Sequence, residues 1–422
     1  MTGTTHFTKV PPLVNLTQVS RDVIFSATPV CSSSGLNQGY PSGKGDNMNR
    51  RRFIKNSLVA GAGLISSTSS RASSPGAFSP QSELNFPLRL DSNENPLGIS
   101  LKVQETIQAR LSQANRYPFS FTEELIEAIA LHHGIDRVCV VPGAGSSEVL
   151  QMVVQALCDT TSLFMSSTPT FEVAENAARS LNVQTARIPL TEDYHHDLER
   201  LRQRSEQHPG RVLIYLCNPN NPTATLTPTR LIEQWIKAAP ENITFLVDEA
   251  YHEYVDDPEY YSLARLAETL GNLIVTRSFS KIYALAGLRV GYGIAAPGVI
   301  DRVKAFASAG SVNTLGVLAA VTALQDSEFV QRGKKVNEES KQLFIRFLRE
   351  LNLDFLPTHT NFLMFRIRGP FGDFVSRLRE ARIQIGRAFP SMGEHCRISL
   401  GLPHEMEYVG RVLLDFREKG WI

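Results

Sequence analysis

The sequence has few cysteines, almost no net charge and no apolar run long enough to cross a bilayer. Its cysteines are widely spaced and form no CxxC pair, so we expect neither a disulfide framework nor a metal site, and interpret them as mostly buried small hydrophobic residues. They are Cys31, Cys139, Cys158, Cys217 and Cys396. The 43 basic and 42 acidic residues leave a formal net charge of +1, which argues against nucleic acid or an acidic membrane surface as a partner.

The composition is that of a soluble globular protein with a sizeable core. The 422 residues are 42% hydrophobic and 20% charged, values typical of globular domains. A chain of this length commonly forms two or three domains. We predict a boundary near residue 84 and another near residue 308, which gives segments 1–84, 85–308 and 309–422.

The first segment differs from the rest of the chain. Residues 1–47 are rich in Ser, Thr, Gly and Pro, and we expect them to be disordered. Residues 48–72 then run from adjacent arginines through a short uncharged stretch to small residues near Ala72, the order of a twin-arginine export signal. Because such signals begin a chain, Met48 is an alternative start to Met1. We expect export to the periplasm; the alternatives are a basic tail without a role and a cytoplasmic protein.

From residue 85 onward, short apolar runs alternate with helical patterns. The runs are at 138–141, 212–216, 243–247, 273–275 and 290–294, with helices such as 146–157 and 228–238 between them. Uniformly apolar runs are typical of strands buried on both faces, so we predict an α/β fold with a mostly parallel sheet between two layers of helices. A long helical stretch at 315–351, apolar runs at 362–367 and 398–400, and helices at 371–381 and from Pro403 predict a smaller α+β domain.

Polar and glycine-rich residues follow four of the predicted strands. They are residues 143–147, 218–223, 248–251 and 277–281. In open α/β sheets, ligands bind beyond the carboxyl ends of the strands. We therefore expect the four segments to meet at one cleft.

The segment around Lys281 carries the most specific chemistry. A lysine amine forms Schiff bases with pyridoxal phosphate, and Ser278, Ser280 and Arg289 are suited to hold its phosphate. The alternative is a lysine on a solvated loop, and the serines, the arginine and the preceding buried strand argue against it. Gly145, Ser146 and Ser147 open a helix and predict a second group of phosphate ligands at its N-terminus, a role compatible with helix capping by the two serines.

These motifs resemble the class I/II aminotransferases of fold type I. The resemblance rests on residues 278–291 and extends over roughly Leu88 to Ile422. Within that class it is strongest to the histidinol-phosphate aminotransferase family, through residues 91–98, 116–118 and 218–223. It implies a seven-stranded sheet, pyridoxal 5'-phosphate as the cofactor, and ping-pong transfer of an amino group to a 2-oxo acid such as 2-oxoglutarate.

The resemblance also implies roles for residues around the cofactor ring. Asp248 is expected to pair with the pyridine nitrogen, Tyr251 and Asn221 to contact the ring hydroxyl, and Phe171 to stack on the ring. Without the resemblance, Asp248 is equally a strand-end helix cap, Asn221 a turn residue and Phe171 a core residue. Asn221-Pro222 is also a candidate cis bond.

Three further residues are expected at the substrate and the subunit interface. Tyr117 resembles a tyrosine that reaches the cofactor phosphate of a neighbouring subunit, which implies a homodimer with shared sites. Arg397 resembles the arginine that binds the substrate carboxylate, and Arg387 one placed for a distal phosphate or carboxylate. Surface salt bridges are the alternative for both arginines.

Some features depart from the family pattern or leave other functions open. Ala224 stands where the family has a turn glycine, and the segment between Arg387 and Arg397 is short for the histidinol-phosphate type. Rival interpretations are a pyridoxal-phosphate decarboxylase, lyase or cyclase, a catalytically inactive binding protein, and a nucleotide-binding enzyme suggested by residues 143–145. Since histidinol phosphate is a cytoplasmic intermediate, the export signal favours a general amino acid aminotransferase, with histidinol phosphate kept open.

Overall fold

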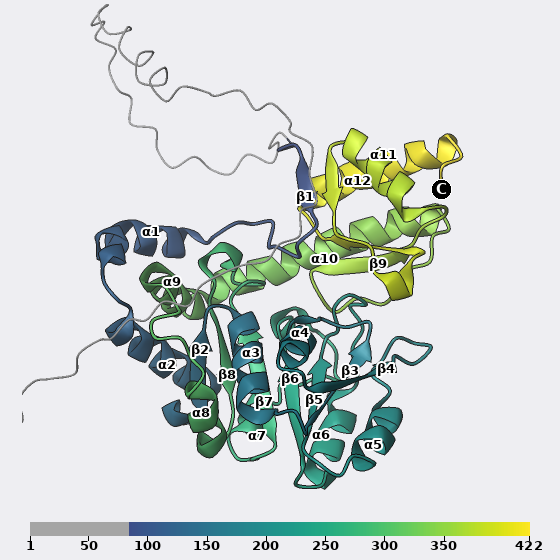
Figure 1. The fold of residues 1–422 in the computed structure, drawn as a ribbon. Coiled ribbons are helices and arrows are strands. Elements are labelled where there is room, and N and C mark those ends of the chain that lie inside the picture. The colour runs from purple at the N-terminus through teal and green to yellow at the C-terminus, as the bar shows by residue number, and fades with distance from the viewer. Residues whose placement is uncertain (1–83) are drawn as a thin grey trace, which may run out of the picture. The chain divides into compact units, whose positions relative to one another are not determined.

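The computed structural model describes residues 84–422, drawn in colour in Figure 1. The predicted disordered segment, the export signal and Cys31 lie outside the described residues. Within them, no helix is both long and apolar enough to cross a membrane.

A seven-stranded sheet forms the centre of the structure, with the order β2-β8-β7-β6-β5-β3-β4. Only β8 runs antiparallel to its neighbours, so the predicted mostly parallel sheet is confirmed. The strands are β2 (Val140–Gly143), β3 (Leu163–Thr168), β4 (Gln184–Pro189), β5 (Val212–Cys217), β6 (Ile243–Asp248), β7 (Leu273–Ser278) and β8 (Gly291–Ile294).

Helices cover both faces of this sheet because its strands are apolar on both faces. In β5, Leu213 and Tyr215 join one hydrophobic core while Ile214 and Leu216 join the other. The first core includes α3 (Ser146–Leu157), α4 (Val173–Ser180) and α8 (Pro297–Lys304). The second includes α1 (Leu101–Arg110), α2 (Phe119–His133), α5 (Leu198–Glu206), α6 (Thr229–Ala238), α7 (Ala264–Ala267) and α9 (Thr314–Leu324). Helix α3 has the predicted bounds.

A separate core forms around two small sheets. Strand β1 (Leu88–Leu90) pairs with β10 (Ile383–Ile385), and β9 (Phe362–Arg366) pairs with β11 (His395–Ser399). Helices α10 (Ser327–Glu350), α11 (Phe371–Glu380) and α12 (Pro403–Glu418) pack against them. Strand β1 joins this core, whereas α9, which follows residue 309, packs in the large one.

Two predicted elements differ from the structure. The helical stretch at 315–351 is two helices, α9 and α10, separated at Gln325 and Asp326. The buried Asp326 carboxylate forms a 2.9 Å ion pair with Lys102, and the later part of α10 packs in the second core. The run at 138–141 begins as a 3-10 turn, because the Asp136 side chain accepts from the Val138 amide. The short 3-10 helices are η2 (Leu111–Asn115), η3 (Arg137–Cys139), η4 (His252–Tyr254), η5 (Ala286–Leu288) and η6 (Pro390–Met392).

The described cysteines bear out the expectation that most are buried. Cys139, Cys217 and Cys396 are buried and Cys158 is partly buried, and all of them are free thiols. No group of three His, Cys, Asp or Glu side chains suited to a metal ion occurs in residues 84–422.

Candidate active site

A cavity of about 370 Å³ lies at the carboxyl ends of the central strands and the start of α3. It brings together residues from all four polar segments. The predicted residues that line it are Ser146, Ser147, Phe171, Asn221, Asp248, Tyr251, Ser278, Ser280, Lys281, Arg289 and Arg397. A larger surface cavity, about 560 Å³, lies beside Arg366 and Glu394 and contains none of them.

Lys281 follows β7 and points its amine into this cavity. Its Nζ lies 3.2 Å from the Asn93 carbonyl oxygen and 3.4 Å from that of Ser92. Burial, together with the positive charge of Arg397, lowers the pKa of Lys281 to about 8. A tenth or so of the amine is then neutral at pH 7, and only the neutral amine is a nucleophile.

Asp248 ends β6 and is buried at the floor of the cavity. The hydroxyls of Tyr215 and Thr276 donate to its two oxygens at 3.1 Å each. Burial raises the pKa of Asp248 to about 6. No side chain of residues 84–422 forms an ion pair with it, so a cationic group on a bound ligand would supply the missing charge. The capping alternative is wrong, because no helix begins at this residue.

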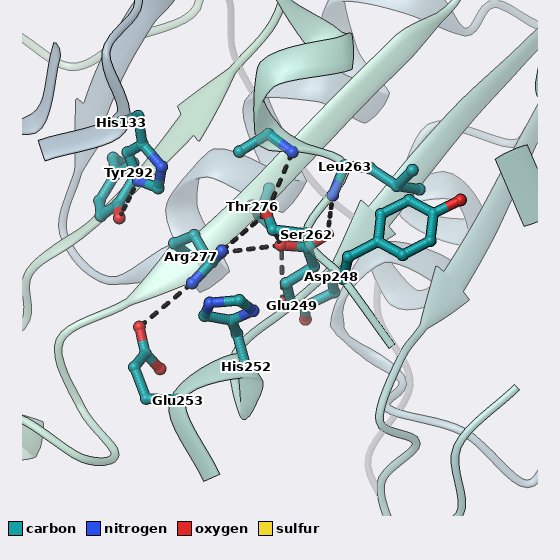
Figure 2. A network of polar contacts seen from close by, with 12 residues as sticks. His133, Asp248, Glu249, His252, Glu253, Ser262, Leu263, Thr276, Arg277 and Tyr292 are labelled. Carbon is teal, nitrogen blue, oxygen red and sulfur yellow. Dashed lines mark hydrogen bonds and ion pairs between the residues drawn. The ribbon is translucent and has the colours of Figure 1, made fainter. Parts of the chain in front are cut away.

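A buried ion network lies beside Asp248 (Figure 2). It is centred on Arg277, the residue before Ser278, and includes Glu249, the residue after Asp248. Arg277 donates to Glu249 at 2.9 Å, to Glu253 at 3.2 Å and to Ser262 at 2.8 Å. The network ties the end of β6 to the end of β7, and so holds the two strands that carry Asp248 and Lys281. Residue types along the chain did not single it out.

Arg289 and the start of α3 form an anion cradle. Arg289 has the left-handed φ of 55° and donates to the Ser280 hydroxyl at 3.3 Å. Gly145 is the N-cap of α3, with a φ of 80°, and a Cβ added there would collide with the Arg289 guanidinium. The interpretation of Ser146 and Ser147 as helix caps is wrong, because Gly145 holds that position without a side-chain bond. Their hydroxyls line the cavity instead.

The Tyr251 hydroxyl is held by two asparagine side chains from distant parts of the sequence. Asn93 and Asn221 donate to its hydroxyl at 3.0 and 3.4 Å. Arg397 in turn donates to the Asn221 side-chain oxygen at 2.7 Å and to the Asp91 carbonyl at 2.9 Å. Arg397 forms no ion pair with a carboxylate of residues 84–422, so its guanidinium can bind a substrate anion.

The sequence alone assigned no role to Asn93 and did not single out Asn361. The backbone N–H of Asn93 donates to the Ser399 hydroxyl at 2.8 Å, and that hydroxyl donates to the Asn93 side-chain oxygen at 3.2 Å. The Asn361 amide donates to the Asn93 carbonyl at 2.9 Å. The signal for Asn93 was present in residues 91–98, which carried the resemblance without an assigned role.

Three predicted residues do not line this cavity: Gly145, whose backbone starts α3 beside it, Tyr117 and Arg387. Tyr117 is 78% exposed and stacks on Phe119 with ring centres 5.6 Å apart. Arg387 forms an ion pair with Glu172 at 2.5 Å.

The turn at Ala224 keeps the conformation that a glycine would favour. Ala224 has a φ of 65° and is fully buried, so this chain accepts the steric cost of a left-handed alanine. The Asn221-Pro222 bond is cis, as predicted.

Together these groups fit pyridoxal phosphate. The Lys281 amine matches the aldehyde, Asp248 the cationic ring nitrogen, and the cradle of Arg289, Ser278 and Ser280 the phosphate. Phe171 lines the cavity and can cover the ring.

Comparison with known proteins supports the same assignment. The pattern of the family "Aminotransferase class I and II" matches residues 87–413. A histidinol-phosphate aminotransferase from Caldicellulosiruptor saccharolyticus is 32% identical over 325 residues, which cover 76% of this chain and 90% of that protein. The crystal structure of a proposed histidinol-phosphate aminotransferase from Erwinia carotovora atroseptica SCRI1043 has a TM-score of 0.78 at 36% identity, covering 80% of this chain and 97% of that one.

A further crystal structure shares the fold and contains the cofactor. It is histidinol-phosphate aminotransferase from Sinorhizobium meliloti in complex with pyridoxal-5'-phosphate, with a TM-score of 0.72 at 24% identity over 77% of this chain and 89% of that one. With the fold type I architecture, the family match and the cavity in agreement, the chain belongs to the class I and II aminotransferases and is a pyridoxal-phosphate-dependent aminotransferase.

Proposed function

We propose that this enzyme moves an amino group from an amino acid to a 2-oxo acid such as 2-oxoglutarate by a ping-pong mechanism. The observation that carries the proposal is one cavity in which the Lys281 amine lies with Asp248 and with Arg397, an arginine that no carboxylate of the described chain neutralises. A carboxylate on Arg397 is common to amino acids and 2-oxo acids, so one arginine can serve both half-reactions.

Each residue then has a distinct task in the reaction. Pyridoxal phosphate, when bound, supplies an electron sink for the charge left on the substrate carbon. Arg397 binds and orients the substrate carboxylate. The Nζ of Lys281 accepts the proton from the carbon that bears the amino group, which a pKa of about 8 permits near neutral pH. The Asp248 carboxylate would hold the protonated ring nitrogen of the cofactor and so keep the ring cationic.

Histidinol phosphate is the second candidate donor, because relatives about one third identical carry that name. Its phosphate would occupy Arg397 in place of a carboxylate. The N-terminal sequence favours the first candidate: we propose export by a twin-arginine route, with a cytoplasmic location as the alternative. Sequencing the N-terminus of the mature protein tests this, since peptides from residues 2–47 would contradict a start at Met48.

A donor screen tests the proposed reaction. With the donor alone, a transaminase accumulates the pyridoxamine form of the cofactor, whereas a decarboxylase, lyase or cyclase returns the aldehyde form. We expect Lys281→Ala to abolish turnover and Lys237→Ala, on an exposed helix face, to leave it unchanged. Normal turnover in the Lys281→Ala enzyme would refute the proposal.

We also propose a homodimer with shared sites. Exposed apolar side chains gather on α1 and η2 and on the segment that starts α2: Leu101, Leu111, Tyr117 and Phe119. Tyr117 is the residue expected to reach the partner's cofactor phosphate. Mixing a Tyr117→Phe chain with a Lys281→Ala chain should restore activity, because one site of the mixed dimer then has both groups. No recovery above the separate chains argues against sharing.

A further inference from the structure

A second, smaller cavity lies near the cofactor cavity, on the residues that surround Phe171 in the sequence. Phe171 lines the first cavity, while the next residue, Glu172, lines the second, of about 120 Å³. Arg387 and Phe389 line the second cavity as well. Arg397 of the first cavity lies against the ring of Phe389, which lines the second, so the far end of a substrate whose carboxylate is on Arg397 would be close to this space.

A single aromatic ring connects the two arginines. The Arg387 guanidinium carbon lies 4.8 Å from the centre of the Phe389 ring and that of Arg397 lies 5.3 Å from it. Both cations therefore rest on Phe389, which is buried. Only the Phe389 ring separates Arg387 from Arg397, so Arg387 lies where it could contact the far end of a substrate whose carboxylate is on Arg397.

Arg387 is already neutralised in this structure. Its Nη2 lies 2.5 Å from a carboxylate oxygen of Glu172, and the two side chains are 57% and 42% exposed. The other arginine of the cavity, Arg187, donates to both oxygens of buried Glu175 at 2.8 and 3.0 Å. Each arginine that lines this cavity is thus matched by a carboxylate.

This charge balance treats two kinds of substrate differently. A distal carboxylate or phosphate must displace Glu172 from Arg387, or lie beside its negative charge. An uncharged side chain does neither. At a separation of 5–6 Å near the surface, one such charge changes an anion's affinity by about tenfold.

We propose that Glu172 is a specificity-determining counter-ion that occupies Arg387 and weakens the binding of any donor or acceptor with a second, distal anion. This rests on the proposed function, since it assigns the far end of the same substrate site. The enzyme accordingly favours partners with uncharged side chains, and 2-oxoglutarate binds against the competition of Glu172.

The simpler alternative is an ordinary surface ion pair. Exposed pairs contribute little to stability, and an acidic residue at the start of a helix such as α4 is favourable by itself. Under that alternative, removing the charge of Glu172 changes the affinity for all ligands equally or not at all.

The test uses two unreactive ligands of equal length that differ by one distal carboxylate, glutarate and pentanoate. Their dissociation constants are measured by calorimetry on the holoenzyme, so the result does not depend on turnover. We expect Glu172→Gln to tighten glutarate about tenfold and to change pentanoate by less than about twofold. Arg387→Met should weaken glutarate and leave pentanoate unchanged, because the distal carboxylate then loses its cation while the charge of Glu172 remains beside it.

Glu407→Gln is the matched control, since Glu407 pairs with Arg411 on the surface of α12. It should leave both dissociation constants unchanged. If the ratio of the two constants in Glu172→Gln stays within about twofold of the wild-type ratio, the proposal is wrong. If the ratio shifts as expected but no donor forms the pyridoxamine form, the proposed function fails while the counter-ion role stands.

Discussion

The pKa of the Lys281 amine determines how the rate of cofactor attachment to the cofactor-free enzyme depends on pH. Burial and the charge of Arg397 lower the pKa of Lys281 to about 8, from a usual value of 10.5. At pH 7 the neutral fraction is then about one in ten, against about one in three thousand for an ordinary lysine. Attachment of pyridoxal phosphate at pH 7 should therefore be about 300-fold faster per amine than for a free lysine side chain.

The assay follows covalent attachment by absorbance in enzyme stripped of cofactor. N-Acetyl-lysine methylamide, measured in parallel, corrects for ionisations of the cofactor itself. The corrected rate constant should rise about tenfold per pH unit below pH 8 and become constant above it. A rate that still rises tenfold per unit between pH 9 and 10 would refute the reasoning.

Two charge variants test the physical cause with opposite signs. The positive charge of Arg397 lowers the pKa of Lys281 and the negative charge of Glu94 raises it. Arg397→Gln should thus move the midpoint of the profile to higher pH, and Glu94→Gln should move it to lower pH. Shifts in the same direction would show that a change in cavity structure, and not charge, controls the amine.

The other predictions concern the groups around the cofactor. Arg277→Met leaves two buried glutamates unpaired, which should cost about 3–5 kcal/mol and lower Tm by about 6–10 °C in a thermal scan; a shift under about 2 °C would contradict it. Asp248→Asn cannot accept from both hydroxyl donors and removes the negative charge, so kcat should fall by about hundredfold or more while folding, followed by circular dichroism, is kept. Gly145→Ala should displace the Arg289 guanidinium and weaken pyridoxal phosphate by about tenfold in an equilibrium titration; unchanged affinity would show that the cradle does not depend on this close approach.

Local sequence was sufficient for the elements that carry the cofactor residues. The apolar runs at 212–216 and 243–247 are strands, and the helix at 146–157 has the predicted bounds. The polar residues after these strands meet in one cavity, as expected. The apolar period that marks a strand or a helix is a property of a short segment, so these elements follow from neighbouring residues.

Other predictions failed where distant segments compete with local preference. The helical pattern at 315–351 has no strong breaker, yet α9 ends at Leu324 and α10 begins at Ser327, with the Asp326 between them paired to distant Lys102. The serines after Gly145 have the residue type of helix caps, but the glycine takes that position beneath Arg289.

The residue types read along the chain identify the amine, the acid and the phosphate ligands, because each lies within a few residues of a strand end. The partners that tune them come from far away: Asn93 meets Tyr251 across 158 positions, Arg397 meets Asn221 across 176, and Arg387 meets Glu172 across 215. Such pairings depend on how two separately packed cores face each other, and no local pattern encodes that geometry. The chemistry could therefore be inferred from the order of the residues, while the neutralised Arg387, on which the proposed substrate preference rests, is seen only in the folded chain.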